Sequence, residues 1–231
     1  MLAADSVVRH YGRGTQAVTV LDGISVTVAP GQRVALCGPS GSGKSTMARV
    51  LALLERPDAG TVILDGAPVR EAGLALPREL RLRVALLWQS PRLAADPRLN
   101  LASMVGEPLR SGGRRHRPAA TELDARVSEA CARVGLVPEL RERFPHEVSE
   151  GQLQRACLAR ALITAPSYLI CDEPTSMLDV STQAALLAAI ADDVRARGAG
   201  VLLITHDRLL AEHWCDWIID LPALRAPGGT R

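Results

Sequence analysis

Gly38-Pro39-Ser40-Gly41-Ser42-Gly43-Lys44-Ser45-Thr46 is the stretch of sequence that decides the fold. It matches the pattern G-x-x-x-x-G-K-[ST] of phosphate-binding loops at every required position. Residues 33–37 before it, which are apolar after Arg33, predict a buried strand, and residues 47–54 after it predict a helix. In such a unit the glycines let backbone N–H groups turn around an anion, and the helix N-terminus adds its positive dipole end. The stretch therefore predicts a site for nucleotide phosphates.

Two side chains of this loop carry the predicted chemistry. Lys44 can reach the β- and γ-phosphates of a nucleotide, and Ser45 can hold Mg²⁺. Lys44 is also the only lysine among the 27 lysine and arginine residues, so a chain biased toward arginine still has lysine at this position. The alternative is a glycine-rich turn with a chance lysine, which the flanking strand and helix disfavour.

The composition limits the possible environments of the chain. Its length of 231 residues suits one large domain, and with 47% hydrophobic but only 3% aromatic residues the core must be filled by aliphatic side chains. The net charge of +2 gives no bias toward nucleic acid, and we expect no nucleic-acid partner. The five scattered cysteines, without a C-x-x-C pair, predict a reducing, cytosolic environment. No apolar run approaches the roughly 18 residues of a membrane span, so a role at a membrane requires docking to another protein.

Strand and helix patterns alternate along most of the chain. We predict helices over residues 150–164, with Ser149 as N-cap, and 178–195. We predict strands over residues 7–11, 17–28, 61–66, 83–88, 168–171, 201–205 and 217–221. This alternation predicts an α/β fold with a mostly parallel sheet, and the first two strands suggest an antiparallel edge.

Residues 90–148 differ from the rest because they are rich in proline and carry no strong strand pattern. Helical patterns fit residues 99–109 and 122–135, with Thr121 as the predicted N-cap of the second helix. We interpret this region as a helical insertion into the α/β core. Its arginine-rich run 110–117 is interpreted as a solvated loop rather than a contact for phosphate or lipid headgroups.

Asp172 and Glu173 directly follow the apolar strand at 168–171 and supply the carboxylates that a phosphate loop lacks. Asp172 would bind Mg²⁺ directly or through water, and Glu173 would orient or deprotonate a water at the γ-phosphate. Phosphoryl transfer depends mostly on positioning and charge neutralisation, so two carboxylates and a metal suffice. The alternative, an acidic pair at a helix start, is disfavoured by the phosphate loop upstream.

Three further side chains stand at predicted strand ends. Gln89 could contact Mg²⁺ or the attacking water, His206 could contact the γ-phosphate, and Tyr11 could stack on a purine base. Taken alone, each also has an ordinary explanation, as a polar strand terminator, a structural histidine and a partly buried strand residue.

Longer motifs identify a family resemblance. Phe144-Pro145-His146-Glu147-Val148-Ser149-Glu150-Gly151-Gln152-Leu153-Gln154-Arg155 resembles the signature motif of ABC-type ATPases, and Ala159-Arg160-Ala161-Leu162 follows it as in that family. Asp172-Glu173-Pro174-Thr175-Ser176-Met177-Leu178-Asp179 also matches. The motifs stand in the family's order from Tyr11 to His206. The chain looks like the nucleotide-binding subunit of an ABC transporter.

The resemblance implies an ABC ATPase form of the P-loop NTPase fold, with a mostly parallel sheet and an N-terminal antiparallel β subdomain. Residues 1–231 would form one domain, in which 1–89 and 149–231 make the core and 90–148 an inserted helical subdomain. The resemblance also implies a head-to-tail dimer with a homologous or identical ATPase subunit. ATP and Mg²⁺ would be bound at each interface of that dimer.

The roles of individual residues follow from the same resemblance. Catalysis would fall to Lys44, Gln89, Glu173 and His206, and Mg²⁺ would be held by Ser45, Gln89 and Asp172. Tyr11 would stack on adenine, and Asp179 would link the two sites. The phosphates would lie on Gly38, Pro39, Ser40, Gly41, Ser42, Gly43, Lys44, Ser45 and Thr46. The partner subunit's nucleotide would meet Ser149, Gly151 and Gln152, at a helix N-terminus that favours an anion.

One branch of the family is the most similar. Pro145-His146-Glu147 and residues 178–184 resemble the importers of oligopeptides, dipeptides and nickel. This implies transmembrane permease subunits, an extracytoplasmic substrate-binding protein and a peripheral position on the cytoplasmic face of the cell membrane. Residues 90–148 would dock on the permease. The expected function is ATP hydrolysis that drives import of peptides, nickel or metal chelates; an ABC exporter subunit and a soluble ABC ATPase outside transport are the alternatives.

The sequence departs from the family pattern at two places. Glu150 replaces the usual first glycine of the signature, where a carboxylate would either repel the partner's γ-phosphate or point to solvent. We expect hydrolysis to survive, because Ser149, Gly151 and Gln152 remain. The chain also lacks the C-terminal extension of many peptide-importer ATPases, which weakens the case for a peptide cargo.

Overall fold

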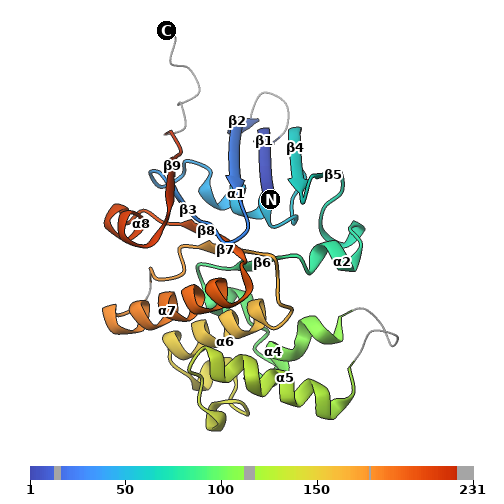
Figure 1. The fold of residues 1–231 in the computed structure, drawn as a ribbon, viewed down its shortest axis with the longest axis vertical. Helices are drawn as coiled ribbons and strands as arrows, with labels where there is room; N and C mark the ends of the chain where they lie inside the picture. The colour runs from blue at the N-terminus through green and yellow to red at the C-terminus, as the bar shows by residue number, and fades with distance from the viewer. Residues whose placement is uncertain (13–16, 112–117, 177, 223–231) are drawn as a thin grey trace.

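The computed structural model describes residues 1–12, 17–111, 118–176 and 178–222. Most of the arginine-rich run 110–117 therefore lies outside the described residues. Within them the strands form a four-stranded antiparallel sheet of order β2-β1-β4-β5 and a five-stranded parallel sheet of order β6-β7-β8-β3-β9 (Figure 1). The α/β fold predicted from the sequence is confirmed.

The antiparallel sheet holds β1 (Leu2–Tyr11), β2 (Val18–Val28), β4 (Ala59–Leu64) and β5 (Ala67–Val69). It is a sheet of its own rather than an antiparallel edge of the parallel sheet. β1 begins five residues earlier than predicted, since Leu2 already pairs with Val28 and with Leu64. Register shifts after Ala4 break the two-residue alternation that would have revealed this start.

The parallel sheet is the central layer of the molecule. It holds β6 (Val84–Leu87), β7 (Tyr168–Asp172), β8 (Gly200–Ile204), β3 (Arg33–Cys37) and β9 (Trp217–Asp220). Every residue of β7 and β8 is buried, as expected for parallel strands covered on both faces. Ile170 and Leu202 lie in the apolar cluster shared with the antiparallel sheet and the helix after the phosphate loop, whereas Leu169 and Leu203 lie in the cluster on the opposite face of the sheet.

Helices lie on both faces of the parallel sheet (Figure 1). α1 (Lys44–Leu51) lies between the two sheets, while α6 (Glu150–Leu162) and α7 (Val180–Arg197) cover the opposite face of the parallel sheet. The remaining helices are α2 (Arg78–Arg81), α3 (Pro91–Ala94), α4 (Leu101–Arg110), α5 (Ala120–Arg133) and α8 (Arg208–Trp214). α4 and α5 pack beside α6 in one apolar cluster. The division into core and helical subdomains stays a prediction.

Of the two N-caps predicted from the sequence, one is confirmed and one is wrong. Ser149 caps α6 in a reciprocal capping box with Gln152, as predicted. The prediction of Thr121 as an N-cap is wrong, because α5 starts at Ala120 and Thr121 lies in its first turn. α5 begins two residues after Pro118 without a side-chain cap, and its buried side chains join the cluster formed with α4 and α6.

In the described part of the chain, no helix combines the length and the apolar character needed to cross a bilayer.

The central strand offers a direct test of this layering. Ile170→Ala removes a side chain of β7 that is 0% exposed and faces α1. We predict a loss of about 2–5 kcal/mol in the free energy of unfolding, from lost burial and the cavity left behind. Urea unfolding would measure it. Val180→Ala is the matched control, because Val180 is 80% exposed and its truncation should change stability by less than about 0.5 kcal/mol.

Candidate active site

The site residues gather where the parallel strands end. β6, β7, β8 and β3 are neighbours in the sheet and run in the same direction, so their carboxyl ends meet at one edge. Gln89 follows β6, Asp172 ends β7, His206 follows β8, and the phosphate loop follows β3. Binding at the carboxyl edge of a parallel sheet is the general rule for open α/β folds.

The phosphate loop is built around a buried cation. Lys44 is 6% exposed, and its Nζ donates to the carbonyl oxygens of Gly38 and Pro39, both at 2.8 Å. Among the described residues no carboxylate forms an ion pair with it. A buried ammonium held by neutral carbonyls alone is costly, so the loop is suited to receive an anion.

Gly43 shows why the loop needs glycine. Its φ is +93°, a left-handed conformation that other residues rarely adopt. A Cβ at this position would also stand 2.6 Å from the carbonyl oxygen of Val20. Both the backbone angle and the close approach of β2 therefore exclude a side chain here, immediately before α1 begins. The first turn of α1 directs amide groups without a partner inside the helix toward the loop.

Ser45 and Asp172 form a pair of oxygen donors that fits Mg²⁺. The Ser45 hydroxyl donates to Asp172 Oδ1 at 3.2 Å. Burial raises the pKa of the Asp172 carboxyl, and the hydrogen bond from Ser45 offsets only part of that effect. A divalent cation would supply the missing positive charge, and a carboxylate beside a hydroxyl is a donor set that Mg²⁺ accepts.

Glu173 is the centre of a second group. It is held in a left-handed backbone conformation with φ +44°, which is strained for a residue with a side chain. Its carboxylate accepts a hydrogen bond from Gln89 Nε2 at 3.2 Å and lies 3.3 Å from His206 Nδ1. The structure thus brings together Gln89, Glu173 and His206, three residues that the family resemblance places around one nucleotide.

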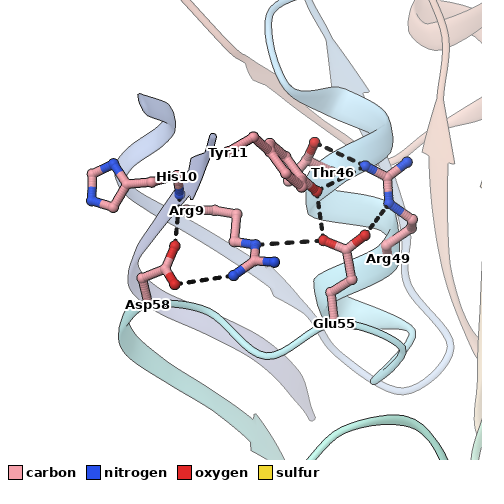
Figure 2. Close-up of polar contacts among 7 residues, drawn as sticks. All are labelled: Arg9, His10, Tyr11, Thr46, Arg49, Glu55 and Asp58. Carbon is pink, nitrogen blue, oxygen red and sulfur yellow. Dashed lines mark hydrogen bonds and ion pairs between the residues drawn. The ribbon is translucent and has the colours of Figure 1, made fainter. Parts of the chain in front are cut away.

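Tyr11 is held by polar contacts that the sequence did not reveal (Figure 2). Its hydroxyl donates to Glu55 at 2.5 Å and accepts from Arg49 at 3.0 Å, while the guanidinium of Arg9 lies 5.1 Å from the ring centroid. Burial alone would raise the pKa of Glu55, but the hydrogen bonds from Tyr11 and Arg49 outweigh it and lower the pKa. Arg49 also donates to Thr46 of the phosphate loop at 3.2 Å. The ring is therefore fixed relative to the loop.

The signature residues lie elsewhere in the chain. Ser149 Oγ accepts from the Gln152 amide at 3.2 Å, and Gln152 Oε1 accepts from the Ser149 amide at 2.9 Å, so both side chains define the start of α6. Gly151 lets this turn approach α7, since a Cβ there would stand 2.8 Å from Thr182 Cγ2. Within the described residues no hydrogen bond joins residues 149–152 to the phosphate loop. α1 and α6 lie on opposite faces of the parallel sheet (Figure 1).

The Glu150 carboxylate has a partner that the sequence did not reveal. It accepts a hydrogen bond from Arg92 Nε at 2.9 Å. Asp179 caps α7 and accepts from Thr182 and Ser181, which lowers the pKa of its carboxyl.

Sequence reasoning missed the supporting residues, chiefly Arg49, Glu55, Arg92 and Gln154. Gln154 is 1% exposed, and its Nε2 donates to the Pro174 carbonyl at 3.0 Å. A polar residue on the apolar side of a predicted helix was the one available signal for it. The others are ordinary charged residues in the sequence, and only the fold brings their partners near.

Comparisons with known proteins agree with this geometry. A family model described as ABC transporter matches residues 21–176. The nickel import ATP-binding protein NikE of Rhodospirillum rubrum is 40% identical over 210 residues, which cover 89% of this chain and 73% of that protein. The di/tripeptide transport ATP-binding protein DppF of Pseudomonas aeruginosa is 35% identical, covering 95% of this chain and 69% of that protein.

A solved structure agrees as well. The dimeric post-hydrolysis state of the ATP-binding cassette MJ0796, bound to ADP and Pi, superposes with a TM-score of 0.85 at 25% identity, covering 97% of both chains. The family model spans more than half of the described fold, and the relatives span most of it. The chain belongs to the ABC transporter family and is one of its ATPase cassettes.

Proposed function

We propose that the chain hydrolyses ATP at a site shared with a second ATPase subunit and so drives import through a membrane permease. The observation that carries the proposal is the separation of two anion-binding features in one chain. α1, which follows the phosphate loop, and α6 lie on opposite faces of the parallel sheet, and among the described residues no hydrogen bond joins residues 149–152 to the loop. A head-to-tail pair of subunits, identical or homologous, would bring the α6 start of each to the nucleotide of the other.

The residues at the sheet edge would divide the reaction between them. Lys44 would leave the carbonyls of Gly38 and Pro39 for the β- and γ-phosphates, and Ser45 with Asp172 would hold Mg²⁺, which neutralises phosphate charge when bound. Glu173 would orient the attacking water. Gln89 donates a hydrogen bond to its carboxylate, and His206 Nδ1 lies 3.3 Å from the same carboxylate. The backbone strain at Glu173 supports a functional rather than a structural role.

The base end of the nucleotide would meet Tyr11. Because Glu55 and Arg49 hold the hydroxyl, the ring is preorganised and stacking costs little side-chain entropy. The link from Arg49 to Thr46 supports one continuous site for base and phosphates.

A groove beside Gln89 supports docking to a permease subunit. It has a volume of about 260 Å³ and runs between β6 and the helices α3, α4 and α6. Its lining is mostly apolar but contains two arginines, Arg81 and Arg160, beside Leu54, Leu86, Trp88, Ala94 and Pro108. A permease helix with an apolar face and an acidic end would fit this lining. The cassette would thus sit on the cytoplasmic face of the membrane.

The cargo would be nickel, a metal chelate or a peptide, delivered by an extracytoplasmic binding protein. Similarity to a nickel import protein and to a di/tripeptide transport protein supports these classes.

Glu173→Gln tests the catalytic assignment. The variant should bind ATP, hydrolyse it at least about 100-fold more slowly because the carboxylate is lost, and accumulate a closed dimer in the assembled transporter. Steady-state hydrolysis and size-exclusion chromatography with ATP would measure both effects. Glu129→Gln on the exposed surface of α5 is the matched control and should change neither. Normal turnover in Glu173→Gln would refute the role of Glu173.

Lys44→Ala tests the phosphate site. Removal of the buried ammonium should abolish nucleotide binding or hydrolysis, because no other lysine can reach the loop. Calorimetric titration with ATP and a hydrolysis assay would measure this. Retention of both would contradict the assignment of the loop.

Substitutions of Tyr11 separate ring stacking from hydroxyl bonding. Tyr11→Ala should weaken ATP binding by about 5- to 100-fold, whereas Tyr11→Phe should keep it within about threefold, because stacking needs only the ring. Inorganic triphosphate, which has no base, should bind both variants as well as the parent. Equal losses for Phe and Ala would show that the hydroxyl network, not stacking, is what matters.

A further inference from the structure

The segment after β6 lies along one stripe of α6. Gln154 donates to the Trp88 carbonyl at 3.5 Å, Cys157 Sγ lies 3.8 Å from the Pro91 carbonyl oxygen, and Arg160 donates to the Ala94 carbonyl at 2.9 Å. Glu150, bound by Arg92, continues the same helical spacing to the first turn of α6. Residues 88–94, which include Gln89, are thereby fastened to the whole length of the helix that begins with the signature residues.

Arg92 makes the contacts at the signature end of this stripe. Besides the bond to Glu150, its Nη1 donates to the Pro145 carbonyl at 3.2 Å and its Nη2 to the Val148 carbonyl at 3.4 Å. One guanidinium therefore binds the bend before α6 and the first residue of α6 at once. The planar fork of arginine suits this task, and a lysine could not make all three contacts in the same geometry.

Glu150 places a negative charge at the start of α6, and Arg92 compensates this charge. A carboxylate in the first turn of a helix satisfies the positive end of the helix dipole. In the proposed dimer the same helix start must attract the terminal phosphate of the partner's nucleotide, so a free Glu150 would compete with that phosphate and repel it. The ion pair with Arg92 removes the net charge. Both side chains are partly exposed, at 48% for Arg92 and 31% for Glu150, so they lie at the surface where a second subunit would close.

We propose that Arg92 is a positioning residue for hydrolysis: it neutralises Glu150 and ties the start of α6 to the Gln89 segment. The first turn of α6 then keeps its affinity for the partner's nucleotide although a glutamate replaces glycine, and it moves together with Gln89. The inference rests on the proposed two-subunit site.

The test uses ATP-driven dimer closure, which requires no hydrolysis. In the Glu173→Gln background of the assembled transporter, Arg92→Ala should raise the ATP concentration for half-maximal closure by about fivefold or more, because Glu150 is left uncompensated. Addition of Glu150→Gly should restore closure to within about twofold of the parent. Arg98→Ala is the matched control, because Arg98 pairs only with Asp96 two residues away among the described residues, and it should have no effect.

Two measurements distinguish charge compensation by Arg92 from a purely structural role. Arg92→Lys retains the charge without the planar guanidinium and should raise the ATP concentration for half-maximal closure less than Arg92→Ala does. The defect of Arg92→Ala should also shrink as salt rises, since an exposed charge is screened.

The outcomes separate this inference from the proposed function. A parent that never closes with ATP would overturn both. A parent that closes normally while Arg92→Ala matches it, or while Glu150→Gly fails to rescue Arg92→Ala, would overturn the role of Arg92 alone.

Discussion

The buried ammonium of Lys44 is the constraint on which the rest of the site depends. Two carbonyl oxygens at 2.8 Å are all that the loop offers it, and neutral acceptors do not repay the loss of water around a charge. This unfavourable burial occurs at the edge of the parallel sheet where β6, β7, β8 and β3 end. Asp172, Glu173, Gln89 and His206 reach the same edge because the order β6-β7-β8-β3 makes their strands neighbours. A site with an unpaired cation, a half-compensated buried carboxylate and a strained glutamate is arranged for a charged ligand with a metal.

The second constraint is the separation of the phosphate loop from the start of α6, on which the proposed two-subunit site rests. The start of α6 offers amide groups and the Ser149 hydroxyl, but α6 covers the face of the sheet opposite to α1. The contacts along α6 connect this helix start to the nucleotide edge. Gln154 donates to the carbonyl of Pro174, the residue after Glu173. Residues 88–94, which include Arg92, lie along α6. In the proposed dimer, these contacts within one chain would link Gln89 to the surface where a second subunit binds.

The sequence predicted those parts of the structure that local patterns encode. The strands β3, β7 and β8 consist mostly of apolar residues in a row, and the capping box of Ser149 and Gln152 is a local signal. The family resemblance is confirmed by the comparisons. Local signals failed where tertiary structure decides: the start of β1 is hidden by a bulge, and α5 starts before Thr121 because its apolar face must meet α4 and α6. The pair of Arg92 and Glu150 spans 58 residues of sequence, and no pattern in either segment points to the other.

The shared site is tested most directly by a structure of the Glu173→Gln variant, assembled with its transporter partners and loaded with ATP and Mg²⁺. The account predicts that Lys44 of one ATPase subunit and Ser149 or Gly151 of the opposite subunit contact the same terminal phosphate, or the equivalent residues if the partner is a different polypeptide. A nucleotide held by one chain, with the start of α6 facing solvent in the closed state, would contradict it.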